Sequence, residues 1–519
     1  MAFSLFKKKT HQRSTDTSLM VLVKEYVASC DVILYENPKI YHHQKTVDVA
    51  SLMILPNRGI VLFEDIDWEF DTIKDATVSS RLPSSKKSSS VVFDSPLHVI
   101  NQKFNEVLHK DLNITKGFIL FNDLKQEEFD LLDESFHQLI PKSRVLFNDE
   151  TLDSLRDKLE TAFVDSLNIT TTSIISTLFM QYTLLSDNEH IEHAVVNEEQ
   201  KNYIDTEFSD ISTLIGPYGS GRSTLMLLKV LIQKIETPKK RFLIIEPTHT
   251  ACEIMKHRLL AAIEHAIVDV DISTIDIITP KELLTQHAQA LYKKPLEPIE
   301  ITPKMMKKKF NIADVIICDD IELLSDEFIF YLMHIQKGST LHFVSADTDK
   351  AKGNSTTLSK SYRVTQSTLE LCKKDLKSHD SYKNISNIKF SEGNIYMETI
   401  LAFKKILKNR EADEKSLIIT PNKSFSHALF DEMHDYVEEE ISLFDGSQSL
   451  VNQAFDTHLI AQYDEIASLQ QNYVILSGIN PEDTMKFCYA LGRAKKNIHV
   501  IFNDEDFHDI NLEIKEFFE

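Results

Sequence analysis

The stretch "TLIGPYGSGRSTLMLL", residues 213–228, decides how the second half of the chain folds. An apolar run, "STLIG" (212–216), leads into a glycine-containing turn, and "STLMLLKVLIQKI" (223–235) then repeats apolar residues at helical spacing. The turn follows the phosphate-loop pattern G-x-x-x-x-G-K-[ST], except that Arg222 stands at the lysine position. The sequence therefore predicts a strand, a phosphate-binding loop with one altered residue, and a helix.

The chemistry of such a loop depends on the groups that the motif brings together. Its backbone N–H groups would ring a phosphate at the helix N-terminus, where the helix dipole favours an anion, and the Ser223 hydroxyl would lie in place to bind Mg²⁺. Upstream, "VVNEEQKNYI" (195–204) carries a glutamine whose amide could hydrogen-bond both edges of an adenine. A turn followed by a capped helix would give the same pattern without binding a nucleotide. The predicted nucleotide-binding residues are Gln200, Gly216, Gly219, Ser220, Gly221, Arg222, Ser223 and Thr224.

Short apolar strands alternate with longer helical patterns from residue 211 onward. Such alternation predicts parallel sheets that helices cover on both faces. The strands fall into two groups, separated by a long gap between residues 347 and 416. The fold class is therefore predicted to be α/β, with two doubly wound lobes. The predicted strands span residues 212–216, 241–247, 314–320, 340–347, 416–421, 473–478 and 497–502.

Two further segments carry charged residues beside a predicted strand. In "VIICDDIELL" (315–324) a strand ends in two carboxylates, the form expected where Asp319 orients Mg²⁺ and Asp320 assists an attacking water. In "YALGRAKKNIHVIF" (489–502) Arg493 precedes a strand, where it could stabilise charge that develops on a phosphate. Acidic residues follow many strands, so neither segment alone defines a site.

Taken in order, these segments resemble the motifs of superfamily 1 helicases of the UvrD/Rep type over residues 195–519. The resemblance implies two RecA-like lobes with a nucleotide cleft between them. It also implies ATP and Mg²⁺ as cofactors and single-stranded DNA or RNA as a partner. The segments that carry it are the glutamine at 200, "GPYGSGRST" (216–224), "EPTHTA" (246–251), "IITPKELL" (277–284), "CDDIE" (318–322), "SADTD" (345–349), "SYRVTQSTLEL" (361–371) and "YALGRAKK" (489–496).

The same resemblance assigns roles to individual residues. Asp320, Arg363 and Arg493 are the expected catalytic residues, with Arg363 as the arginine that senses nucleotide. Ser223 and Asp319 are the expected Mg²⁺ ligands.

The sequence departs from this family at positions that handle nucleotide. Arg222 replaces a lysine, and a planar guanidinium is bulkier and differently shaped from an ammonium group. Asp320 replaces a glutamate, and Lys350 stands where the family has glutamine. These changes leave a second interpretation open: a catalytically inactive pseudo-helicase and pseudo-nuclease. Such a protein would be a scaffold or regulatory subunit of a DNA-processing or defence complex, with a partner protein supplying the active nuclease or helicase.

The N-terminal part of the chain resembles NERD, the nuclease-related domain that often precedes a helicase. The segments that match are "LPNRGIVLFEDIDW" (55–68) and "SPLHVINQK" (95–103). The resemblance implies a restriction-endonuclease-like α/β domain and a metal site built from Asp48 and Glu64. Ile66 occupies the position of the family's lysine, so we expect a vestigial site that does not hydrolyse nucleic acid.

These patterns divide the chain into four predicted parts. A Ser/Lys-rich segment, 77–92, interrupts the first of them as a loop. The parts are a NERD-like domain (1–165), a helical connection (166–194), a first RecA-like lobe (195–360) and a second RecA-like lobe (361–519).

Composition narrows the class of protein. A net charge of −22 argues against a surface coated by nucleic acid, although a local basic groove remains compatible with it. The five scattered cysteines, the missing signal peptide and the absence of a long apolar run predict a soluble cytoplasmic protein with no membrane contact. The pair of histidines in "YHHQ" (41–44) has no metal-ligand spacing around it, so the sequence predicts no transition-metal site.

Overall fold

The computed structural model describes residues 17–30, 32–43, 45–66, 68–75, 94–108, 114–163, 170–179, 183–184, 194–293, 300–308, 310, 312–335, 338–346, 348–372, 377–378, 388–444, 457–479 and 484–502. The chain divides into two compact units. The first comprises Met1–Val196 with Ile263–Asp269, and the second comprises Asn197–Ala262 with Val270–Glu519. The whole loop predicted at 77–92 and parts of the connection predicted at 166–194 lie outside the described residues.

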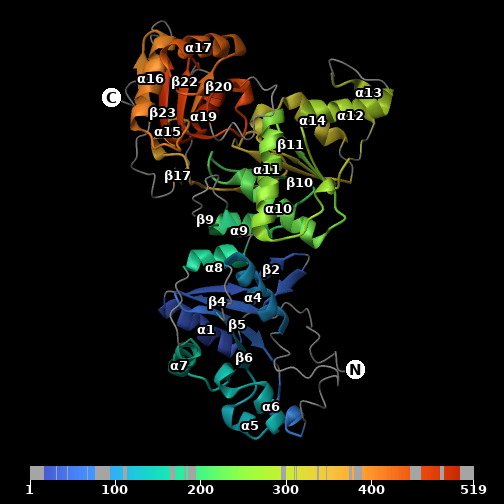
Figure 1. The fold of residues 1–519 in the computed structure, drawn as a ribbon. Coiled ribbons are helices and arrows are strands. Elements are labelled where there is room, and N and C mark those ends of the chain that lie inside the picture. The colour runs from blue at the N-terminus through green and yellow to red at the C-terminus, as the bar shows by residue number, and fades with distance from the viewer. Residues whose placement is uncertain are drawn as a thin grey trace. The chain divides into compact units, whose positions relative to one another are not determined.

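The first unit is built on a five-stranded mixed sheet, drawn mainly in blue in Figure 1. Its first three strands pair antiparallel and its last three pair parallel. Alternate residues of the central strands face two separate hydrophobic cores, so both faces of the sheet are buried. In sheet order the strands are β1 (Ile33–Glu36), β4 (Ser51–Leu55), β5 (Gly59–Asp65), β6 (Thr115–Phe121) and β7 (Val145–Phe147).

Helices cover the two faces of this sheet. One core takes apolar residues from α1 (Ser18–Ser29) and α7 (Leu152–Ala162). The other takes them from α4 (Asp94–Leu108) and α8 (Thr171–Leu178). The predicted α/β character of this part is confirmed, while its identity as a NERD domain stays a prediction.

A separate antiparallel ribbon contacts helix α4. It consists of β2 (Lys39–His42) and β3 (Lys45–Asp48), in which His42 is opposite Lys45. His43, in the turn between them, has a φ of 51°. Few residues other than glycine adopt this left-handed conformation, and histidine is one of the side chains that adopt it more often than most.

The second unit contains two six-stranded sheets, and every strand pair in both is parallel. The first sheet has the order β12 (Ile275–Ile278), β11 (Phe242–Ile245), β13 (Val315–Cys318), β14 (Thr340–Ser345), β10 (Ile211–Ile215) and β15 (Asn354–Thr357). The second has the order β18 (Ile388–Glu392), β23 (Ala494–Phe502), β22 (Gln471–Ser477), β19 (Ser416–Thr420), β21 (His458–Gln462) and β20 (Ile441–Phe444).

Non-consecutive neighbours in both sheets require crossover connections, which the helices supply. The inner strands β11, β13 and β19 are buried along their whole length, as expected for parallel strands covered on both faces. Figure 1 shows the first sheet in green and yellow and the second in orange and red. The principal helices are α10 (Arg222–Glu236), α11 (His249–Ala266), α12 (Pro280–Tyr292), α14 (Asp326–Ile335), α16 (Ile395–Asn409), α17 (Lys423–Tyr436) and α19 (Thr484–Leu491).

The predicted α/β class with parallel sheets is confirmed. Each of the seven predicted strands of this half overlaps an observed strand, and the sheets contain further strands that the pattern did not indicate. None of the helices described is long and apolar enough to cross a membrane.

Candidate functional site

The predicted phosphate loop connects β10 to α10. Gly219 and Gly221 have φ angles of 78° and 85°, in the region where side chains are strained. The Leu225 N–H donates to the Gly221 carbonyl at 2.8 Å, which is the first bond of the helix. The N–H groups of residues 221–224 therefore have no acceptor within the helix and are available to an anion.

A segment that follows the first sheet holds this loop in place. The Tyr362 N–H donates to the Gly219 carbonyl at 2.9 Å, and the Ser361 hydroxyl donates to the Tyr218 carbonyl at 2.7 Å. A Cβ atom added to Gly219 would lie 2.6 Å from the Arg363 Cβ. Because the two backbones approach so closely, only glycine fits at 219.

Gln200 lies on α9 (Glu198–Asp205), where it is 1% exposed. Its side-chain oxygen accepts from the Asn197 N–H and its side-chain nitrogen donates to the Ser220 carbonyl, both at 2.9 Å. The amide thus links the start of α9 to the phosphate loop. The predicted contact of Gln200 with an adenine stays a prediction. It would require the amide to give up one of these two hydrogen bonds and form one to the base instead.

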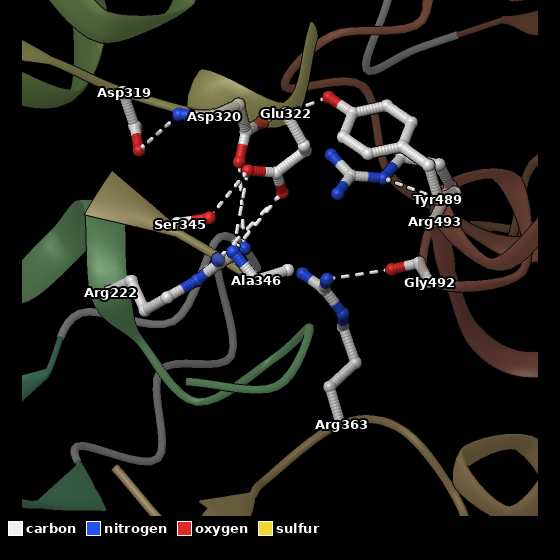
Figure 2. Close-up of polar contacts among 10 residues, drawn as sticks. All are labelled: Arg222, Asp319, Asp320, Glu322, Ser345, Ala346, Arg363, Tyr489, Gly492 and Arg493. Carbon is white, nitrogen blue, oxygen red and sulfur yellow. Dashed lines mark hydrogen bonds and ion pairs between the residues drawn. The ribbon is translucent and has the colours of Figure 1, made fainter. Parts of the chain in front are cut away.

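The carboxylates predicted after β13 are buried. Asp319 is 1% exposed, and one of its oxygens accepts from the Asp320 N–H at 2.9 Å. Asp320 has a φ of 42°, in the left-handed region, and its side chain lies beside Tyr489 of α19 (Figure 2). There its Oδ2 accepts from the Tyr489 hydroxyl at 2.9 Å.

Arg222 points at two carboxylates, as Figure 2 shows. Its Nη2 lies 3.5 Å from Asp320 Oδ1, and its Nη1 lies 3.8 Å from Glu322 Oε1. Glu322 is itself held by the Ser345 hydroxyl and the Ala346 N–H, each at 3.3 Å. We call Arg222, Asp320 and Glu322 the arginine–carboxylate cluster.

Two more arginines approach this cluster from other parts of the chain (Figure 2). Arg363 Nη2 donates to the Gly492 carbonyl at 2.7 Å. The Arg493 guanidinium lies 4.1 Å from the centre of the Tyr489 ring and is 4% exposed. The structure therefore brings together the predicted residues Arg222, Asp320, Arg363 and Arg493, which come from four separate segments.

Burial controls the protonation of the acidic groups. Desolvation, and then the neighbouring Asp320 charge, raise the pKa of Asp319, while the Ser223 hydroxyl opposes that rise. Desolvation also raises the pKa of Glu322, and the Arg222 charge opposes it. A cation near these groups would favour their ionised forms.

The donor set fits a magnesium–nucleotide. A serine hydroxyl and a carboxylate are ligands that Mg²⁺ prefers, and a helix N-terminus beside a guanidinium suits phosphate oxygens. Three buried polar atoms near the loop have no hydrogen-bond partner among the residues described, so they can take a ligand: Ser220 Oγ, Arg222 Nη1 and Asp319 Oδ2.

Sequence reasoning gave no role to three residues at this site. Glu322 is part of "CDDIE", and its position three residues after Asp319 is the feature of the sequence that could have placed it at the site. Tyr489 begins the segment "YALGRAKK", in which the motif pattern indicates a role only for Arg493. Glu246 directly follows β11; it is fully buried, both of its oxygens lack hydrogen-bond partners among the residues described, and burial raises its pKa well above the usual range.

The residues of the predicted nuclease site lie in different sheets. Asp48 ends β3 in the two-stranded ribbon, whereas Glu64 lies in β5 of the five-stranded sheet. Ile66 is 9% exposed and belongs to the core. Among the residues described, neither carboxylate takes part in a group of three or more metal-ligating side chains. The vestigial nuclease site stays a prediction.

Comparison with known proteins gives structural similarity only. No protein-family model matches the chain, and no curated protein sequence does. The DUF1998 helicase MrfA bound to DNA is 12% identical with a TM-score of 0.42, over 64% of this chain and 52% of MrfA. Saccharomyces cerevisiae Dbp5 bound to RNA and ADP-BeF3 is 12% identical with a TM-score of 0.44, over 62% of this chain and 87% of Dbp5. The DEAD-box helicase Mss116 bound to single-stranded RNA and UDP-BeF is 14% identical with a TM-score of 0.43, over 60% of this chain and 70% of Mss116.

Proposed function

We propose that this chain is an ATP-binding, helicase-like protein of the UvrD/Rep type that acts on single-stranded nucleic acid. The observation that carries the proposal is the approach of Arg222, Arg363 and Arg493 to one phosphate-type loop. Two of these arginines, Arg222 and Arg493, are buried, and arginines that gather around a helix N-terminus are suited to a polyphosphate. Two parallel sheets, one carrying the loop and the other carrying Arg493, correspond to two RecA-like lobes.

Each residue has a defined role in this proposal. The loop N–H groups and Arg222 bind phosphate oxygens, while Arg363 and Arg493 stabilise the charge that develops on the terminal phosphate. Ser223 and Asp319 would hold Mg²⁺, which supplies charge neutralisation when bound. Asp320 orients the attacking water.

The contacts of Asp320 suggest how nucleotide binding acts on the rest of the unit. Arg222 and Tyr489 both engage Asp320, and Tyr489 belongs to the segment that leads into the second sheet. A triphosphate that draws Arg222 away from Asp320 changes what Tyr489 contacts. Nucleotide therefore biases the relation between the two lobes, because it binds one arrangement better than the other.

The decisive experiment is steady-state ATP hydrolysis by the full chain, with and without single-stranded DNA or RNA. The variants are Arg222→Lys, Arg222→Ala and Arg493→Ala, with exposed Arg241→Ala as the matched control. We expect turnover that nucleic acid stimulates and that both alanine variants at the site lose. Unchanged turnover in Arg493→Ala would remove that arginine from the site.

A second function, a non-catalytic scaffold, is favoured by one observation. Arg222 already has two carboxylates as partners, so it can stabilise the loop without any nucleotide. Such a protein would act through a partner that supplies the active nuclease or helicase. The same hydrolysis assay separates the alternatives: a scaffold shows no turnover with arginine, lysine or alanine at 222.

A further inference from the structure

The ribbon of the first unit places two consecutive histidines beside helix α4. His42 Nε2 lies 3.0 Å from Glu106 Oε2, and His43 Nε2 lies 3.4 Å from the same oxygen. The two imidazole rings have centroids 4.4 Å apart. Consecutive strand residues normally point to opposite faces, so the turn conformation of His43 is what brings both rings to one carboxylate.

We propose that His42, His43 and Glu106 form a binding site for a transition-metal ion of the zinc class. One potential ligand atom from each of these residues lies within 4.8 Å of the others, and these residues are the only such group among those described. Tetrahedral zinc with bonds of about 2.0–2.1 Å separates its ligands by roughly 3.3 Å, close to the separations of Glu106 from each imidazole. Two nitrogens and one carboxylate oxygen favour zinc over Mg²⁺ or Ca²⁺.

Two neighbouring groups favour a cation at these three residues. Gln102, one turn earlier on α4, donates to Glu106 Oε1 at 2.9 Å and leaves Oε2 to face the imidazoles. On the far side of the His43 ring, Nδ1 lies 3.8 Å from Asp269 Oδ1. This separation is too long for a hydrogen bond, so Asp269 adds negative charge beside the site without fixing the orientation of the ring.

The backbone fixes the same geometry. The His43 N–H donates to the Ile267 carbonyl at 2.7 Å, and the Asp269 N–H donates back to the His43 carbonyl at 3.4 Å. Residues 263–269 belong to the same unit as the ribbon. The turn is therefore held in place before any metal binds, which lowers the cost of ordering the site.

Access and charge are compatible with a cation. The His43 and Glu106 side chains are 44% and 33% exposed, so an ion can enter from solvent. Lys103 opposes a cation here, but its ammonium donates to the Tyr41 carbonyl at 2.7 Å and burial lowers its pKa to about 8.

The test measures metal binding by the full chain, expressed without a histidine tag and stripped with a chelator. Zinc is titrated by calorimetry, and Co²⁺ is added separately as a spectroscopic probe of coordination. The variants are His43→Ala, Glu106→Gln and Gln102→Ala, and the matched control is His98→Ala, an exposed histidine on the same helix. Because the chain has 20 histidines, the control shows how much binding is non-specific.

We expect one tight zinc equivalent in the wild type and in His98→Ala, with the visible absorption of four- or five-coordinate Co²⁺. We expect at least a tenfold weaker affinity in both ligand variants, and a weakening of about tenfold in Gln102→Ala. Glu106→Gln keeps the size of the side chain, so it tests the ligand even where His43→Ala folds poorly. If the wild type bound zinc no more tightly than the two ligand variants do, the proposal would be overturned. His42, His43 and Glu106 would then be an ordinary group of ion-paired side chains. Nucleotide is absent throughout, so the result is independent of the function proposed above.

Discussion

Two charged clusters of this chain differ in how far water reaches them. In the arginine–carboxylate cluster, the side chains of Arg222, Asp320 and Glu322 are 6%, 8% and 0% exposed. In the group formed by His42, His43 and Glu106, the exposed fractions are 2%, 44% and 33%. Charges removed from water are strongly coupled to folding, whereas charges that water screens contribute little to it. A variant of the first cluster therefore disturbs fold and function together, while the second can be altered with the fold intact.

The largest effect is expected for Glu322→Ala. This change leaves the buried Arg222 without its Glu322 partner and the Ala346 N–H without an acceptor. Breaking a buried ion pair from one side costs about 3–5 kcal/mol of unfolding free energy. Urea denaturation measures the loss, with exposed Glu327→Ala as the control, expected to stay within about 0.5 kcal/mol. A loss in Glu322→Ala as small as that of the control would mean that water reaches the cluster after all.

The next effect is expected for Gly219→Ala, compared with Gly338→Ala. Both glycines have positive φ angles, 78° and 84°, so both alanines incur a left-handed penalty of about 1–2 kcal/mol. Only at 219 would the new methyl meet other atoms, the Arg363 Cβ at 2.6 Å and the Ser361 hydroxyl at 3.0 Å. Overpacking there adds about 1–3 kcal/mol. Equal losses of stability in the two variants would contradict the tight contact between the loop and residues 361–363.

A third prediction concerns acid. His342 is buried between the Tyr203 hydroxyl at 2.9 Å and the Ser212 hydroxyl at 2.7 Å, near the Lys229 ammonium. Burial lowers its pKa to about 3, so the folded protein keeps it neutral while the unfolded chain protonates it below about 6.5. The neutral His342 therefore makes its full contribution to the unfolding free energy above pH 6.5. Below that pH the contribution falls by about 1.4 kcal/mol for each pH unit, or by about 2 kcal/mol at pH 5.

Denaturation of wild type and His342→Gln across pH 5–7.5 checks this, because the glutamine does not titrate. The difference in unfolding free energy between the two proteins should change by that amount as the pH falls from 6.5 to 5. A constant difference would mean that His342 is protonated in the folded state as well. The arginine–carboxylate cluster is intact in both proteins, so its own titration cancels.

The sequence predicts buried strands better than exposed ones. The inner parallel strands β11, β13 and β19 are continuous apolar runs, and the pattern located them. The edge strand β15 reads Asn-Ser-Thr-Thr, has exposed residues and gave no signal. Its place in the sheet depends on pairing with β10, which only the folded chain supplies.

The candidate sites divide in the same way. The phosphate loop and the two aspartates were predicted, because the motif is contiguous and its geometry is local. The approach of Glu322 to Arg222 was not predicted, because it depends on how far the long arginine side chain reaches in three dimensions. Glu106 lies 63 positions from His43, on a different element, so "YHHQ" gave no hint of a shared ligand set.

The smallest effect is expected for Glu106→Gln in the presence of a chelator. A half-exposed ion pair contributes less than about 1 kcal/mol, so the unfolding free energy should change by no more than that. Added zinc should then separate the two proteins, because a ligand that binds only the folded state stabilises it by about 2.7 kcal/mol at 100 times its dissociation constant. Wild type should gain that stability, while the variant gains much less. A gain of the same size in both proteins would show that zinc binds elsewhere. A large loss in chelator alone would show that this cluster, too, is part of what holds the fold together.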